Sequence, residues 1–461
     1  MTVPPPHRDR YDTTALRAAF AARLSVLYGR EVPAYTTLVD VAREVNADVL
    51  SARGPQAQRL GSIERVTAER HGAIRVGTPA ELAAVAGVFG ALGMVPVGFY
   101  DLRETAAAVP VVSTAFRPVD RDELARNPFR VFTSLLVVDD RRFFTADLAA
   151  RLREFLSRRT LFPPALLALA DRATREGGLD ADDAEAFLSA ATAAFALSPE
   201  PVDRSWYAEL SRVSSVAADI GGVTSTHINH LTPRVLDIDE LYARMQARGI
   251  EMIDEIQGPP RWGGPDLLLR QTSFRALAEP RRFREPDGRI SDDTLRVRFG
   301  EVEARGLAAT PRGRALYDRL LTAPGDAAAN WRAAAPATER GMLDADLAYF
   351  TLAPGSERPD GPVPTTVAEL LDGGWAVATP VVYEDFLPAS AAGIFRSNLT
   401  GDSSRDDESD GAAVDLAWLE GAAGRPIHDP YVLYDAERAA SLDAVTAHWG
   451  LPTIPALPGD R

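Results

Sequence analysis

Three short segments of this 461-residue chain carry side chains that could bind a metal ion. They are His71-Gly-Ala-Ile-Arg75, Thr226-His-Ile-Asn-His230 and Phe299-Gly-Glu-Val-Glu303. The chain has only 6 histidines, and the first two segments each place one near the start of a similar predicted unit. Two imidazoles and one carboxylate form the facial ligand set of mononuclear non-haem Fe(II) oxygenases, which leaves coordination positions open. The segments therefore predict a metal site.

The first segment also offers a cation at a useful distance. A strand alternates its side chains between two faces, so His71, Ala73 and Arg75 share one face. The Cα atoms of His71 and Arg75 would lie roughly 13 Å apart, from four steps of about 3.3 Å. A long guanidinium side chain spans much of that gap and forms bidentate pairs with carboxylates. We therefore expect a ligand bound at the metal by one end to meet Arg75 at the other, which suits a short dicarboxylate.

The second segment contains two candidate histidines. If residues 223–230 form a regular strand, His227 and His230 lie on opposite faces and do not bind one metal together. The β-branched residues and Pro233 argue against a helix that would bring them together. We select His227 as the ligand, because it lies within its strand as His71 does, and we expect a structural or supporting role for His230.

The third segment supplies the carboxylate, and its residues leave two choices open, since Glu301 and Glu303 share a face. Each candidate also has an ordinary structural explanation. A strand histidine is commonly a core or surface residue, an arginine commonly forms a salt bridge, and paired glutamates commonly lie on a solvated strand face. Histidines at equivalent points of two units favour the metal site. The other histidines (His7, His428 and His448) lack such context, and we treat them as surface or structural residues.

The elements around these segments have the same order twice. The first unit has a strand at residues 71–77, a helix to about residue 92, and strands at 95–100, 111–118 and 129–138. Its helix begins with the capping box Thr78-Pro-Ala-Glu81. The second unit has a strand at residues 223–230, a helix at 238–249, and strands at 250–256, 267–277 and 295–303. Both units therefore have the order βαβββ.

These patterns predict an α+β fold in which paired βαβββ modules form a curved mixed sheet around the metal site. We expect five regions: N-terminal helices (1–60), a first module (61–139), a helical insertion (140–220), a second module (221–304) and a C-terminal mixed region that completes the pocket (305–461). Helices are expected at residues 14–29, 36–50 and 312–321, and a strand at 375–383. Residues 400–413 are acidic and poor in hydrophobic residues, so we predict a disordered surface loop there.

Composition excludes several kinds of chemistry. All 50 basic residues are arginine, and cysteine is absent. A lysine Schiff base, a Walker A lysine, a cysteine nucleophile, an iron–sulfur cluster and a thiolate zinc site are therefore impossible. The net charge is −15 and no basic run occurs, so we expect no nucleic-acid partner. No apolar stretch suits a membrane span or a secretory signal, and together with the lack of cysteine this predicts a cytoplasmic protein.

The three segments, with the second extended to Arg234, and a fourth segment resemble the 2-oxoadipate dioxygenase/decarboxylase family, also called 2-hydroxyglutarate synthase. The fourth segment is Tyr383-Glu-Asp-Phe-Leu-Pro-Ala-Ser-Ala-Ala-Gly-Ile-Phe-Arg-Ser-Asn-Leu399. The resemblance spans nearly the whole chain, and its second and fourth segments are long and specific. It implies a fold of the vicinal-oxygen-chelate type, built from paired βαβββ modules.

The resemblance also implies roles for single residues. It implies an Fe(II) site formed by His71, His227 and Glu301, and the Phe-x-Glu placement is similar to that of the glutamate ligand in 4-hydroxyphenylpyruvate dioxygenase. It implies that Arg75 binds the distal carboxylate of the substrate. Ala389 and Ser390 would line the substrate pocket. Ala389 stands where the family commonly has valine, which would enlarge the pocket slightly.

The reaction that the resemblance implies is the conversion of 2-oxoadipate and O2 to 2-hydroxyglutarate and CO2, in lysine breakdown. Two other functions are compatible with the residues. A redox-silent isomerase or lyase with the same fold and metal ligands would act on a small 2-oxo acid without consuming O2. A non-catalytic binding protein could share the fold, because a fold alone does not dictate function. It would keep its metal content and ligand binding after His71→Ala.

Overall fold

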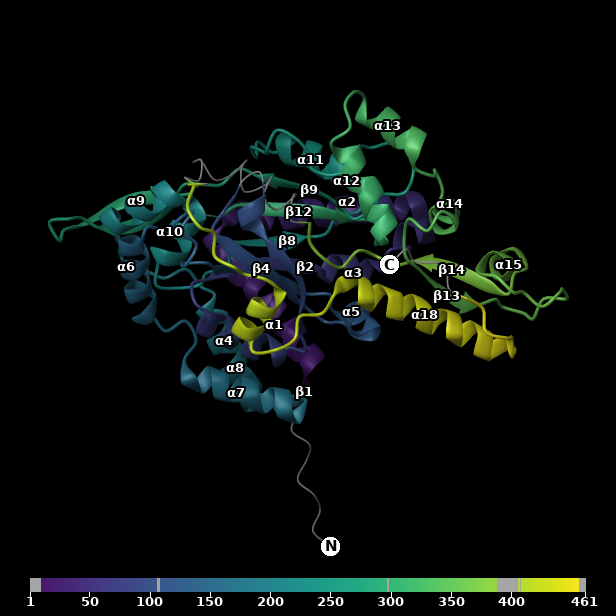
Figure 1. Ribbon diagram of the computed structural model, residues 1–461, viewed down its shortest axis with the longest axis horizontal. Helices are drawn as coiled ribbons and strands as arrows, with labels where there is room; N and C mark the ends of the chain where they lie inside the picture. Colours follow the sequence, from purple (N-terminus) through teal and green to yellow (C-terminus); the bar gives the residue numbers. More distant parts are fainter. Residues whose placement is uncertain (1–9, 106–107, 297, 388–404, 407, 456–461) are drawn as a thin grey trace, which may run out of the picture.

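The structure is a computed structural model that describes residues 10–105, 108–296, 298–387, 405–406 and 408–455. It is a mixed α+β fold in which the strands of the largest sheet lie in the middle of the molecule, with helices around them (Figure 1). The largest sheet has the strand order β3-β4-β5-β2-β8. The prediction of an α+β fold built on βαβββ units is confirmed.

The first unit forms as its pattern predicts. Its elements are β2 (Arg70–Val76), α4 (Pro79–Gly90), β3 (Val95–Asp101), β4 (Val111–Arg117) and β5 (Arg130–Leu136), with α5 (Arg121–Arg126) between the last two strands. Thr78 and Glu81 form the predicted capping box at the start of α4. β2 pairs in parallel with β5, and β5, β4 and β3 pair antiparallel in turn. The outward pairing order is therefore first, fourth, third and second strand.

The second unit repeats this pairing order. Its elements are β8 (His230–Pro233), α11 (Ile238–Ala247), β9 (Leu269–Phe274) and β12 (Gly300–Arg305). A parallel bridge between Arg234 and Glu303 joins the end of β8 to β12, and β12 pairs antiparallel with β9. Isolated bridges of Met252 with Phe274 and of Gln257 with Gln271 stand in place of the second strand. β2 and β8 pair antiparallel, so the two units meet along their first strands.

The second unit departs from the prediction in two places. The strand expected at residues 223–230 begins only at His230, and residues 224–229 lie beside β2 without strand structure. There Thr226 Oγ1 donates to the carbonyl of Arg75 at 2.6 Å, and the backbone N–H of Asn229 donates to the carbonyl of Ala73 at 2.9 Å. An unpredicted hairpin of β10 (Glu279–Arg284) and β11 (Ile290–Leu295) lies between β9 and β12.

Helices precede the first unit and separate the two. The first group is α1 (Thr13–Glu31), α2 (Pro33–Arg53), the short 3-10 helix η1 (Gly54–Gln58) and α3 (Ile63–Ala68), after strand β1 (Arg10–Asp12). Residues 140–220, all of which the structure describes, are mostly helical and hold five helices: α6 (Ala146–Ser157), α7 (Pro164–Glu176), α8 (Ala181–Ala194), α9 (Arg204–Val213) and α10 (Ser215–Gly221). The short strands β6 (Gly178–Asp180) and β7 (Val202–Asp203) complete this part, whereas the 3-10 helix η2 (Leu102–Glu104) follows β3 in the first unit.

The C-terminal part has its own apolar core, which includes Trp331, Tyr349 and Trp375. Its elements are α12 (Pro311–Leu321), α13 (Ala327–Ala334), α14 (Glu339–Asp344), β13 (Phe350–Pro354), α15 (Val367–Asp372), β14 (Ala376–Pro380), α17 (Leu416–Ala423) and α18 (Pro430–Trp449). β13 and β14 pair antiparallel, and the long helix α18 packs beside β13 (Figure 1). The division into five regions stays a prediction.

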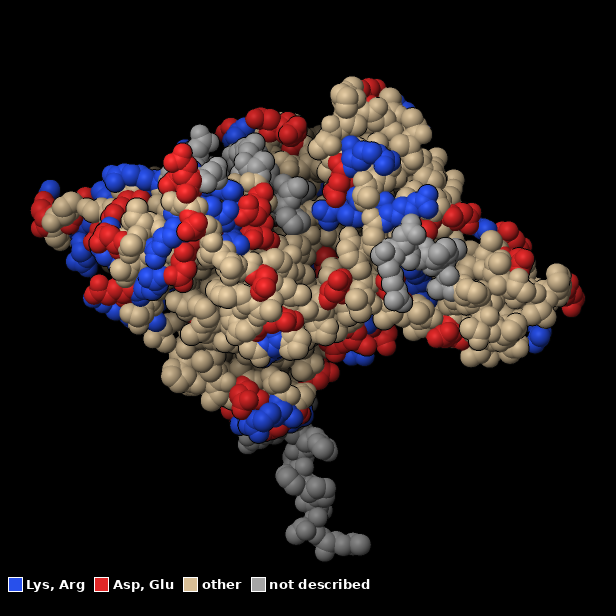
Figure 2. Space-filling view, in the orientation of Figure 1, with Lys and Arg blue, Asp and Glu red and all other residues tan. Residues whose placement is uncertain are grey.

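Acidic and basic side chains are interspersed over the face shown in Figure 2, rather than separated into large patches of one sign. Among the residues that the structure describes, no helix is long and apolar enough to cross a membrane. Of the predicted acidic loop, only residues 405–406 and 408–413 are described.

Candidate metal centre

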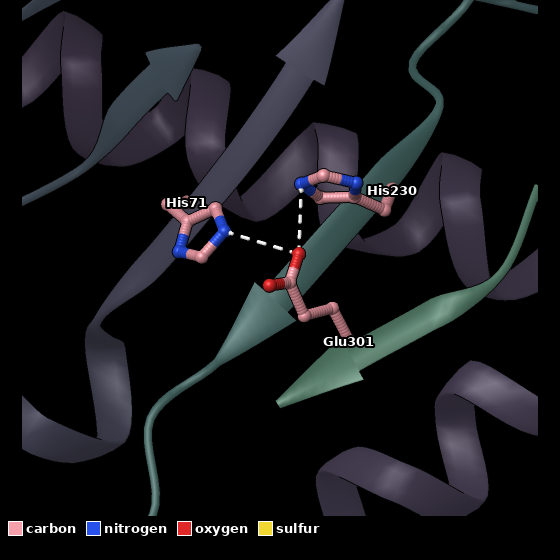
Figure 3. A group of neighbouring side chains, drawn as sticks. All are labelled: His71, His230 and Glu301. Atoms are coloured by element: carbon pink, nitrogen blue, oxygen red, sulfur yellow. Dashed lines mark ion pairs between the residues drawn. The ribbon is translucent and has the colours of Figure 1, made fainter. Parts of the chain in front are cut away.

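His71, His230 and Glu301 come together in the core, although they lie on three different strands (Figure 3). One ligand atom from each residue lies within 4.8 Å of the other two. Glu301 Oε2 is 3.6 Å from His71 Nε2 and 3.2 Å from His230 Nε2. All three side chains are buried. Two imidazole nitrogens and one carboxylate oxygen thus converge on a space of the size that a metal ion needs.

Strand register explains this convergence. β2 and β8 pair so that Ala73 lies opposite His230 and His71 lies opposite Thr232. Residues directly opposite one another in an antiparallel pair project to the same face, so His71 and His230 share a face. Glu301 reaches this face from β12. Its Oε2 accepts a hydrogen bond of 3.4 Å from the hydroxyl of Thr232, which lies on β8.

His227, which we selected as the second histidine, lies outside this cluster. Its Nε2 is 3.2 Å from Asp219 Oδ1 and within 3.2 Å of the Asn229 amide nitrogen. Alternation from residue 223 requires a regular strand there, whereas the chain joins the sheet only at His230. The structure therefore brings His230, and not His227, together with His71 and Glu301.

Glu303 lies behind His71 rather than in the cluster. Its Oε1 is 3.1 Å from His71 Nδ1, on the side of the ring away from the nitrogen that faces Glu301. Arg305 contacts both oxygens of Glu303, at 2.6 and 3.1 Å. Burial opposes the charged carboxylate, but the charges of Arg305 and His71 outweigh it and lower the pKa of Glu303 to about 2. A charged Glu303 is thus placed to accept the Nδ1 proton of His71 and so leave Nε2 for a metal.

A buried group of arginines and glutamates surrounds Glu303. Glu69 receives Arg130 Nη1 at 2.7 Å and Arg234 Nη1 at 2.9 Å. Arg130 also pairs with Glu384, and Arg305 lies 3.3 Å from Glu69. Buried charges persist only when they are paired and hydrogen-bonded. These pairs tie the sheet residues next to the metal cluster to one another, which fixes the backbone that carries the ligands.

The pKa values of the two histidines in the cluster are shifted in opposite directions. Burial alone would lower the pKa of His71, but the charge of Glu303 and the contacts with Glu301 outweigh it, so the pKa is raised. Burial, with the charges of His71 and Arg75, holds the pKa of His230 well below its ordinary value. His230 is therefore neutral, as a metal ligand must be, and a metal must displace any proton from His71.

The donor set passes a further test for a metal site. Neither ring nitrogen of the buried His230 makes a hydrogen bond to the described residues, although Nε2 faces the Glu301 carboxylate at 3.2 Å. A buried polar atom left without a partner costs roughly 1–3 kcal/mol. Metal coordination at Nε2 would satisfy one of these atoms, so the residues present fit a divalent ion held by two imidazoles and a carboxylate.

Aromatic rings close the site against water. Phe386 packs edge-on against the His71 ring, with ring centroids 4.9 Å apart, and Phe299 lies against His230 at 5.4 Å. Phe386 also lines a cavity of about 380 Å³, together with Tyr100 and Tyr383. An apolar surround of this kind limits solvent access to a metal and strengthens its electrostatic interactions. The cavity touches the metal cluster through Phe386.

Arg75 lies on β2, on the same side as His71, as alternation predicted. Its guanidinium is buried and pairs through Nη1 with Asp219. Its charge contributes to the low pKa of His230, so it lies within electrostatic reach of the metal cluster. The other two expected substrate residues, Ala389 and Ser390, lie outside the described residues.

Comparison with known proteins gives consistent matches over nearly the whole chain. Residues 20–398 match the family model described as 2-oxoadipate dioxygenase/decarboxylase. Relatives of that name include a Mycobacterium tuberculosis protein, 61% identical over 93% of this chain and 97% of its own length, and a Pseudomonas putida protein, 40% identical over 95% and 98%. The crystal structure of hydroxyglutarate synthase from Pseudomonas putida in complex with 2-oxoadipate superposes with a TM-score of 0.82 and 38% identity, over 96% of this chain and all of that one.

Proposed function

This chain belongs to the 2-oxoadipate dioxygenase/decarboxylase family, and we propose that it carries out the reaction at a ferrous ion held by His71, His230 and Glu301. It is therefore an enzyme, a 2-oxoadipate dioxygenase/decarboxylase. The reaction consumes one O2 for each CO2 released and leaves a five-carbon hydroxy diacid, 2-hydroxyglutarate. The absence of cysteine supports a cytoplasmic location.

The triad is the single observation that carries the choice of metal. Two neutral imidazoles and one carboxylate on one side of an ion leave positions for both a chelating 2-oxo acid and O2, which suits Fe(II). A bound ferrous ion would supply O2 activation and the oxidative loss of CO2. The charge of Glu301 would offset part of the charge of the ion, and Phe386 and Phe299 would keep bulk water away from it.

The protein itself would orient the substrate. Arg75 lies on the same strand and face as His71, so a chain that starts at the metal meets its guanidinium at the far end. The guanidinium has five N–H donors in a planar fork, and Asp219 is held at Nη1. We expect Arg75 to receive the distal carboxylate of 2-oxoadipate, and Ala389 and Ser390 remain proposed lining residues.

Oxygen uptake tests the reaction. Anaerobically purified, Fe(II)-loaded protein is given 2-oxoadipate while O2, CO2 and product mass are followed together. Equal amounts of O2 consumed and CO2 released, with 2-hydroxyglutarate as the product, would support the proposal. Turnover of a 2-oxo acid without O2 uptake would contradict it and support the redox-silent isomerase or lyase.

Paired histidine variants test the ligand assignment. We expect His230→Ala to lose the bound metal and His227→Ala to retain it, when both are measured by elemental analysis after loading and desalting. The two histidines lie three residues apart and are similarly buried, so each variant is a matched control for the other. Loss of metal from His227→Ala alone would restore His227 as the ligand.

A further inference from the structure

The Arg75 guanidinium belongs to a buried polar cluster with Asp219, His227 and Asn229. Asp219 is the centre of this cluster. Its Oδ2 accepts hydrogen bonds from Arg75 Nη1 and from the side-chain amide of Asn229, the latter at 2.8 Å. Its Oδ1 lies 3.2 Å from His227 Nε2. Each of the four side chains is at most 5% exposed.

The cluster joins two parts of the chain that are distant in sequence from β2. Asp219 lies on α10, the last helix of the insertion, and α10 contacts β2. His227 and Asn229 come from the irregular segment 224–229, which β2 holds through the backbone hydrogen bonds of Ala73 and Arg75. Helix α10 and the side chain of Asn229 therefore fix the position of Asp219 beside Arg75. A fixed carboxylate in turn fixes the direction of a long guanidinium side chain, which otherwise has many rotamers.

We propose that Asp219, which accepts a hydrogen bond from the Asn229 side chain and lies next to His227, is the positioning residue that aims Arg75 at the distal carboxylate of the substrate. This inference rests on the proposed role of Arg75. A guanidinium held by Asp219 keeps its planar fork in one orientation, and bidentate recognition of a carboxylate requires such a plane. The cluster would thus set the preference for 2-oxo dicarboxylic acids over 2-oxo monocarboxylic acids. It would also give the insertion a part in substrate recognition.

The test compares two acids that differ only at the far end. 2-Oxoadipate and 2-oxohexanoate share the metal-chelating group and the six-carbon chain, and 2-oxohexanoate lacks the distal carboxylate. We expect Asp219→Ala in the Fe(II)-loaded protein to weaken 2-oxoadipate binding about tenfold or more, measured by anaerobic calorimetry, because a charge-assisted hydrogen-bond partner of Arg75 is lost. Binding of 2-oxohexanoate should change less than about twofold, since it does not reach Arg75.

The conservative variant separates positioning from packing. Asp219→Asn keeps one oxygen that can accept hydrogen bonds from Arg75 and Asn229, so it should recover most of the lost 2-oxoadipate affinity. Asn229→Ala removes one support of Asp219 and should cause a smaller loss that is still selective for the dicarboxylate, which keeps the test available if Asp219→Ala does not fold. Asp239→Ala removes another Arg–Asp pair, with Arg270, and should leave both affinities unchanged.

If Asp219→Ala weakens the binding of both acids equally, or of neither, the inference is overturned. The Arg75–Asp219 pair would then serve only the fold or have no effect on binding. The role of Arg75 is judged separately. If Arg75→Ala abolishes the preference of the wild type for 2-oxoadipate and Asp219→Ala preserves it, only the positioning role of Asp219 fails. If the wild type shows no such preference, both the role of Arg75 and this inference fail.

Discussion

Substitution of Glu303 by glutamine tests whether a residue behind His71 tunes the metal site. Glu303 Oε1 lies 3.1 Å from His71 Nδ1 and 2.6 Å from Arg305 Nε, and its Oε2 lies 3.1 Å from Arg305 Nη2. A glutamine has only one oxygen, so its amide would face an N–H donor of either Arg305 or His71. The imidazole would also lose a charged acceptor. Changes to groups that orient a metal-bound histidine typically weaken metal affinity about 10–100-fold, or about 1.4–2.7 kcal/mol.

The assay is the dissociation constant of the metal, measured anaerobically by competition with a chromogenic chelator. Glu384→Gln is the matched control, because Glu384 is also buried and pairs with Arg130 and Arg65 in the same group of charges. Among the described residues, Glu384 forms no ion pair with His71. We expect both variants to lose stability, and only Glu303→Gln to lose metal affinity.

Two results would refute this reasoning. If Glu303→Gln binds the metal as tightly as the wild type, the carboxylate behind His71 does not tune the ligand. If Glu384→Gln weakens metal binding as much as Glu303→Gln does, the effect comes from the packing of the charged group as a whole. Circular dichroism and thermal unfolding of each variant would show whether the fold is retained before metal is added.

Three further perturbations have clear signs. The pKa of His71 is raised in the metal-free protein, and the metal needs the neutral ring. Metal affinity should therefore fall by up to about tenfold per pH unit once the pH drops below that raised pKa. Metal titrations from about pH 8.5 to about pH 5.5 would measure this, and an affinity independent of pH would contradict it. Trp331→Ala removes a fully buried side chain of the C-terminal core and should cost about 3–5 kcal/mol in urea unfolding while metal content per folded molecule stays unchanged; a cost below about 1 kcal/mol would show that this core relaxes freely. Gly313→Ala would place a Cβ 1.8 Å from the carbonyl oxygen of Leu347 and should lower the midpoint of thermal unfolding, whereas Gly421→Ala, with nothing within 4 Å, should leave it the same or raise it.

The first unit could be predicted from sequence because its signals are local. The capping box at Thr78 and Glu81 and the apolar runs between turns mark each element within a few residues of its observed end. The second unit hides its equivalent elements. Its second strand is reduced to bridges at Met252 and Gln257, and the hairpin of residues 279–295 interrupts the run from third to fourth strand. Only the pairing order, which is a property of the folded sheet, shows that the two units are alike.

The metal site shows the same limit at the level of one residue. Alternation says which residues of a strand share a face, but it does not say where the strand begins. His227 and His230 lie three residues apart, so the choice between them depended on that starting point. The start is set by pairing with β2, more than 150 residues away along the chain, where Ala73 lies opposite His230. His71 could be predicted because a regular strand contains it, whereas alternation left Glu301 and Glu303 open and only the family resemblance favoured Glu301. The place of His230 in this cluster could not be predicted, because His230 is the first residue of its strand.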